Sequence, residues 1–75
     1  MKLSDVQVGA TVMVIGVPDD PGGRRLEALG FLQGTSIEVT RRAPLGDPTL
    51  YRLRGTELSL RHATAAMVEV EGEHV

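Results

Sequence analysis

Residues 35–54 read TSIEVTRRAPLGDPTLYRLR, and this stretch decides the fold. Apolar and polar residues alternate between Thr35 and Ala43, as they do in a strand with one buried face. Turn-forming residues follow at 44–48, and a second alternating segment runs from Thr49 to Arg54. The stretch therefore predicts a β-hairpin whose loop has five residues.

The alternation in the two halves also predicts the register of this hairpin. If Ala43 faces Thr49, then Val39 meets Leu53 on the buried face. The outer face receives two polar pairs, which are Thr40 with Arg52 and Glu38 with Arg54. In this register the buried face is apolar and the outer face is polar, so we expect this pairing.

Short elements precede and follow the hairpin. Residues 11–17 are apolar on both alternating faces, which predicts a strand covered on both sides. Asp20 and Pro21 suit the start of a short helix that contains Arg24 to Leu29, and Gly30 suits its left-handed end. Two more strands are expected at residues 57–61 and 67–70, separated by a helical turn at residues 62–66.

These elements together predict an all-β fold. Five short strands and one short inserted helix in 75 residues favour a single domain, 1–75, built as a small five-stranded SH3-like barrel. Its core is expected to contain the apolar residues of the periodic segments, namely Leu26, Leu29, Ile37, Val39, Leu53, Leu58, Leu60 and Val68.

Composition excludes several classes of protein. Apolar residues make up 41% of the chain, as in folded domains, and no apolar stretch is long enough to span a membrane, so we expect a cytoplasmic protein without membrane insertion. The net charge of −2 lacks the basic excess of nucleic-acid binders, so no nucleic acid is expected as a partner. Imperfect barrel closure would allow a weak homodimer through an edge strand.

Three ordered sequence blocks carry a family resemblance. They are RLxxLGFxxGTxIxV at residues 25–39, APLGDP at 43–48 and RGxxLxLRxxxA at 54–65. In order and spacing they resemble the FeoA family. The resemblance implies an SH3-like barrel with an inserted helix, in an accessory protein of bacterial ferrous-iron uptake. It also implies a partner, the FeoB permease, which carries a cytosolic GTP-binding domain. The alternative is a stand-alone metal-responsive domain related to the C-terminal domain of DtxR-type repressors.

The sequence gives no support for catalysis. The chain's one lysine is Lys2, so the glycine-rich phosphate loop of a GTPase is missing. There is no cysteine, and Ser4, Ser36 and Ser59 lack a nucleophile motif. We therefore expect a binding module rather than an enzyme, with no cofactor.

A designed iron site is also not expected. A ferrous site usually takes two histidines and a carboxylate, and the chain has two histidines, one of them in an acidic tail. The candidate ligands for adventitious binding of a divalent metal are His62, His74, Glu71 and Glu73.

The hairpin is the expected docking surface. Leu45 lies at the tip of its loop, where burial within the domain is not expected. In the expected register Leu50, Arg42 and Arg52 lie on the outer face nearby, giving an apolar centre with an arginine rim. Two alternatives are a solvated strand face and a Leu45 that folds back over the open end of the barrel.

Overall fold

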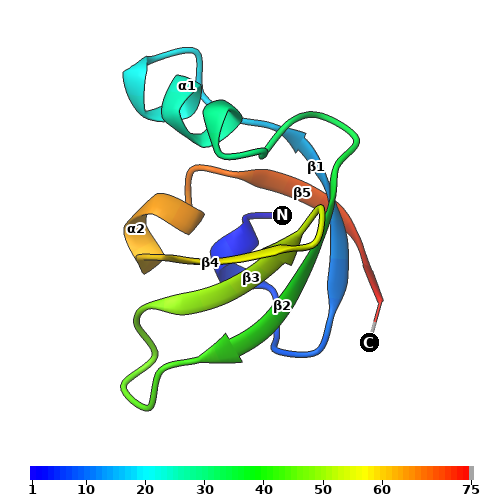
Figure 1. Ribbon diagram of the computed structural model, residues 1–75, viewed down its shortest axis with the longest axis vertical. Coiled ribbons are helices and arrows are strands. Elements are labelled where there is room, and N and C mark those ends of the chain that lie inside the picture. The colour runs from blue at the N-terminus through cyan, green and yellow to red at the C-terminus, as the bar shows by residue number, and fades with distance from the viewer. Residues whose placement is uncertain (75) are drawn as a thin grey trace.

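The computed structural model describes residues 1–74, with the side chains of residues 1–73. In this part of the chain five antiparallel strands form one sheet in the order β4-β3-β2-β1-β5 (Figure 1). The strands are β1 (Thr11–Gly16), β2 (Ser36–Arg42), β3 (Thr49–Leu53), β4 (Thr56–Leu60) and β5 (Glu69–His74). The helical elements are η1 (Leu3–Asp5), α1 (Pro21–Ala28) and α2 (His62–Ala65). The predicted all-β class with one short inserted helix is confirmed.

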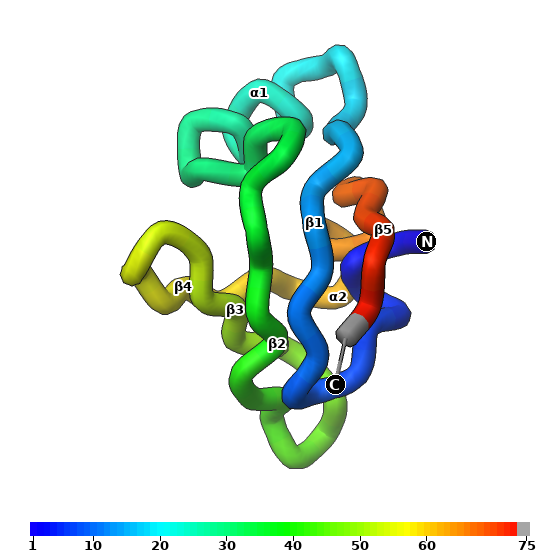
Figure 2. The backbone as a smooth tube through the Cα atoms, turned by 90° about the vertical axis from the view of Figure 1, so that its right-hand side faces the viewer, coloured from blue at the N-terminus to red at the C-terminus, as the bar shows by residue number. Residues whose placement is uncertain are grey.

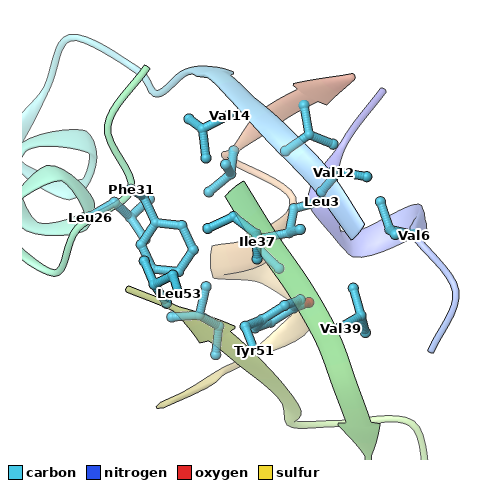
Figure 3. Packing of buried hydrophobic residues seen from close by; sticks show 14 of the residues in the cluster. Leu3, Val6, Val12, Val14, Leu26, Phe31, Ile37, Val39, Tyr51 and Leu53 are labelled. Carbon is cyan, nitrogen blue, oxygen red and sulfur yellow. The ribbon is translucent and has the colours of Figure 1, made fainter. Parts of the chain in front are cut away.

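The sheet curls around one apolar core (Figures 1 and 2). Helix α1 lies at one end of the barrel, and the β2–β3 loop lies at the opposite end. Helix α2 connects β4 to β5 and packs beside η1. Leu26, Phe31, Ile37, Tyr51 and Leu53 gather in this core (Figure 3). No helix within residues 1–74 is long and apolar enough to cross a membrane.

Strand β1 is buried on one face only. Val12 and Val14 point into the core, but Met13 and Ile15 are 47% and 41% exposed. The prediction that this strand is covered on both sides is therefore wrong. The reason is that its neighbours β2 and β5 lie beside it in the same sheet, so no second layer covers the outer face.

The start of α1 is confirmed as predicted. Asp20 is the N-cap, and its Oδ1 accepts a hydrogen bond of 2.8 Å from the backbone N–H of Gly23. Pro21 occupies the first helical position, where its missing N–H is not needed. The helix is thus fixed at its N-terminus by local chemistry.

The end of α1 corrects one core prediction. The backbone N–H of Phe31 donates to the carbonyl oxygen of Leu26 at 3.0 Å, and that of Gly30, with a φ of 110°, donates to Glu27 at 3.0 Å. This Schellman motif turns Phe31 back onto Leu26, and both side chains are buried. Leu29 is left outside with 48% exposure, so its predicted burial is wrong. Leu58 is only partly buried, and the other expected core residues are buried.

The hairpin register is also different from the prediction at the loop. Arg42, rather than Ala43, lies opposite Thr49. Ala43 belongs to the loop, because its backbone N–H donates to Pro48 O and its carbonyl accepts from Gly46 N–H. Pairing therefore stops one residue earlier than the alternation of side chains suggested.

A bulge then shifts the register a second time. Val39 opposes Tyr51, not Leu53, while Arg41 opposes Leu50, which leaves Thr40 as the extra residue. A shift of one residue turns side chains to the other face, and a second shift restores them. Val39 consequently still faces the core, whereas Arg42 is on the same side as the buried Thr49.

Candidate functional site

The β2–β3 loop presents Leu45 to solvent. Gly46 N–H donates to Ala43 O at 2.7 Å, which closes a turn with Pro44 in its second position and Leu45 in its third. Ala43 N–H donates to Pro48 O at 3.0 Å and closes the base of the loop. Leu45 is 97% exposed, which excludes the alternative that it folds back over the barrel end.

The loop is also attached to α2. Asp47 Oδ1 accepts a hydrogen bond of 3.0 Å from the backbone N–H of His62, the first residue of that helix. The N-cap residue of α2, Arg61, makes no side-chain capping bond. Asp47 therefore serves the helix start from across the chain, and it fixes the loop against the body of the barrel.

Arg42 is not part of an exposed rim. Its Nε donates to Thr49 Oγ1 at 2.9 Å, and its Nη2 donates to the carbonyl oxygen of Val6 at 3.0 Å. The side chain is half-buried beside Tyr51. Burial raises the pKa of the Tyr51 phenol, while the hydrogen bond from Thr49 and the charge of Arg42 partly oppose this increase. Arg42 thus joins the hairpin to the N-terminal segment, and the prediction that it faces outwards is wrong.

Arg52 does face outwards, but two carboxylates engage it. Its Nη1 lies 3.2 Å from Glu38 Oε1, and its Nη2 lies 3.7 Å from Glu57 Oε2. Glu38, which was expected opposite Arg54, instead opposes Arg52 in the β2–β3 pairing. The Thr40 hydroxyl donates to Glu57 Oε2 at 2.9 Å. This row of partners spans β2, β3 and β4 and neutralises the guanidinium.

Leu50 lies on the same outer face, half-buried. It is paired with Arg41 of β2 and with Ser59 of β4. Leu45 and Arg52 are exposed and Leu50 is half-buried on the outer face, whereas the half-buried Arg42 is directed towards Thr49 and Val6. The sequence placed Arg42 and Arg52 together in one rim, but their hydrogen bonds and ion pairs show that Arg42 joins the hairpin to the N-terminal segment and that Arg52 pairs with two carboxylates.

A shallow hollow lies on the outer face of β1, with a volume of about 160 Å³. Met13, Ser36 and Glu71 are among the residues that line it. Sites for small ligands usually measure about 300–1,000 Å³. The hollow is therefore too small for a ligand of drug or cofactor size.

The adventitious metal ligands are spread over two elements. His62 opens α2, while Glu71 and Glu73 belong to β5. The side chain of His74 lies outside the described residues. Within the described residues, no group of three or more His, Cys, Asp or Glu side chains is placed to hold a metal ion.

Comparison with known proteins adds a family to this geometry. A family model described as the FeoA domain matches residues 1–72. A fusion of Fe(2+) transport protein A with the Fe(2+) transporter FeoB from Porphyromonas gingivalis is 38% identical over 72 residues, 95% of the chain. The chain spans about 8% of the length of that fusion protein.

Solved structures agree in fold. An FeoA-like protein from Clostridium acetobutylicum is 39% identical with a TM-score of 0.88, covering 95% of the chain and 84% of that protein. The zinc complex of Stenotrophomonas maltophilia FeoA, described as an SH3 domain protein, is 30% identical with a TM-score of 0.84, covering 95% and 89%. The predicted SH3-like barrel is thereby confirmed.

A more distant likeness concerns the fold alone. A manganese-dependent transcriptional repressor is 17% identical with a TM-score of 0.78, and the match covers 91% of the chain and 39% of the repressor. Its function does not transfer to the chain at this identity.

Proposed function

Since the chain belongs to the FeoA family, we propose that it is an accessory domain of ferrous-iron uptake that binds the cytosolic part of a FeoB-type permease. The Porphyromonas gingivalis fusion supports this proposal, because it joins a related domain and a FeoB transporter in one polypeptide. Domains encoded in one chain are held at a high effective concentration. A separate accessory domain needs a docking surface to reach the same partner.

The exposure of Leu45 on an ordered loop is the observation that carries this proposal. It is 97% exposed on a loop that three hydrogen bonds hold in place, two within the loop and one from His62 to Asp47. Burying one leucine contributes roughly 1.5–3 kcal/mol. Because the loop is already ordered, little of this gain is spent on fixing it during binding. Leu50 adds apolar area on the adjoining outer face.

We propose that the domain acts by contact and not by chemistry. Any hydrolysis of GTP would take place in the permease, because Lys2 is the one lysine here and no phosphate-binding loop surrounds it. The domain would then change the rate or stability of the permease through the docked surface. Its location in the cytoplasm is part of the same proposal.

Isothermal titration of the purified domain into the purified cytosolic domain of the permease from the same organism tests this function. We expect a 1:1 complex with a Kd in the range of about 1–100 μM, as for transient complexes with a small interface. Ferrous iron titrated anaerobically in place of the permease domain should give no stoichiometric heat. Tight iron binding without permease binding would contradict the proposal and favour a metal-responsive domain.

A further inference from the structure

We propose that the docked partner presents an apolar socket with an acidic rim, and that Arg41 and Arg61 are the residues that recognise this rim. The proposal rests on the proposed function, because it concerns the same Leu45 surface. It replaces Arg42 and Arg52, which the sequence favoured, with two other arginines.

Five arginines lie on the hairpin or on the segments that follow it, and they divide into three groups. Arg42 donates to Val6 O and Thr49 Oγ1, and Arg52 pairs with Glu38 and Glu57. Arg54 is exposed in the β3–β4 turn, at the end of β3 away from the loop. Arg41 and Arg61 remain: both are exposed, and neither makes an ion pair or hydrogen bond with another side chain in the part of the chain that is described.

Both of these side chains belong to the loop end of the barrel. Arg41 lies four positions before Leu45, so their Cα atoms are at most about 14 Å apart. Arg61 directly precedes His62, whose backbone N–H is bonded to Asp47 of the loop. Arg41 at the end of β2 and Arg61 at the start of α2 therefore lie on two segments that adjoin the loop of Leu45.

Carboxylates leave this end of the barrel with a positive excess. Asp47 is the one acidic residue of the loop and offsets one positive charge, but Arg42, whose hydrogen bonds go to uncharged oxygens, adds another. Glu57 on the neighbouring row is shared by Arg52 and Thr40. The other acidic residues lie on η1, in the α1 region, on β5 and on β2, where Glu38 pairs with Arg52. The chain carries a net charge of −2, so this cationic end is a local asymmetry of charge.

A protein surface fits this arrangement better than a nucleic acid or a lipid surface. Phe31 and Tyr51 are both fully buried and the chain has no Trp, so none of these rings forms an exposed platform for stacking on bases, and the exposed imidazole of His62 is a single small ring. Two arginines at a membrane surface contribute roughly 1 kcal/mol each, which is too little for stable attachment with one leucine. An apolar socket with carboxylates around it satisfies both Leu45 and the arginines.

The test compares two doubly substituted domains for binding to the permease's purified cytosolic domain. One carries Arg41→Gln and Arg61→Gln, and the control carries Arg25→Gln and Arg54→Gln. The control removes the same number of charges from exposed arginines that also lack an ion pair among the described residues. We expect the first variant to associate about tenfold more slowly and with a weaker salt dependence, because rim charges steer association. The control should match the wild type, and thermal melting should be the same for all three.

Three other outcomes would overturn the inference, and a fourth would overturn the proposed function. Equal association by the first variant and the wild type would mean that these arginines recognise nothing, while the proposed function would stand. Equal slowing in both variants would mean that only net charge matters. Binding of the wild type to phosphatidylglycerol vesicles, lost in the first variant while permease binding is unchanged, would assign the arginines to lipid. A wild type that does not bind the permease at all would instead contradict the proposed function itself.

Discussion

Asp47 Oδ1 accepts a hydrogen bond of 3.0 Å from the backbone N–H of His62 and so joins the β2–β3 loop to the first turn of α2. The two residues are fifteen positions apart in the chain. One carboxylate therefore has two effects: it satisfies a free N–H at a helix start, and it holds the loop that presents Leu45. The orientation of the proposed docking surface depends on this contact.

Replacing Asp47 tests that dependence. Asp47→Ala removes the acceptor, and we expect the free energy of unfolding to fall by about 1 kcal/mol, as for loss of a helix cap. Asp47→Asn keeps an oxygen acceptor at the same position and should recover most of this loss. Urea unfolding of the three proteins measures the difference. Equal stability of the alanine variant and the wild type would show that the contact does not contribute.

Two adjacent glycines of α1 should respond very differently to alanine. A Cβ on Gly23 would lie 1.7 Å from the backbone carbonyl oxygen of Pro18, which cannot move without the chain. Gly23→Ala should therefore lower the free energy of unfolding by about 3 kcal/mol or more. A Cβ on Gly22 would lie 2.7 Å from the tip of the Met67 side chain and in ordinary van der Waals contact with Asp20 Oδ1 at 3.4 Å.

Gly22→Ala is thus the matched control for this prediction. The Met67 side chain is flexible and can move aside, and alanine favours a helix over glycine by about 0.5–1 kcal/mol. Its unfolding midpoint should lie close to that of the wild type. Similar midpoints for both variants would contradict the close approach of Gly23 to Pro18.

The single tyrosine of the chain reports on the inside of the barrel. Burial raises the pKa of Tyr51 above its usual 10.0, so the folded state favours the neutral phenol. The neutral Tyr51 phenol therefore contributes fully to the free energy of unfolding below pH 10, and this contribution is lost as the pH rises through the pKa of the folded state. Titration of the phenolate absorbance in the native protein should give a value above 10.

Removing the positive charge of Arg42 should raise the pKa of Tyr51 further. Arg42 lowers the Tyr51 pKa through its charge, so Arg42→Gln should raise it. Arg41→Gln changes an exposed arginine on the outer face and should leave it unaltered. A Tyr51 that titrates at or below 10 in the folded wild type would contradict its burial.

Much of the fold was predictable because it follows from local chemistry. Alternation gave the strands of the hairpin, and Asp20 with Pro21 gave the start of α1. The burial of Leu3, Val6 and Ala10 was not predicted. These residues lie in η1 and the irregular segment after it, where no regular period marks the buried side chains.

The candidate site was predictable only in part, because one bulged residue, Thr40, decides how Arg42 is oriented. Exposure of Leu45 follows from its place in a turn. The orientation of Arg42 depends on the bulge at Thr40, which shifts the register by one residue and turns Arg42 towards Val6 and Thr49. Alternating side chains do not reveal a bulge, because the pattern on either side of it is equally regular.

The most direct test of the account is the affinity of Leu45→Asp for the cytosolic domain of the permease, measured beside Leu29→Asp. Both leucines are exposed, Leu45 on the loop and Leu29 at the end of α1, so each change replaces an exposed leucine with the same charge. We predict that Leu45→Asp melts like the wild type and binds at least about 30-fold more weakly, because it places a charge in an apolar socket. Leu29→Asp should bind like the wild type. Full binding by Leu45→Asp together with loss of binding by Leu29→Asp would contradict the account and place the docking surface at α1.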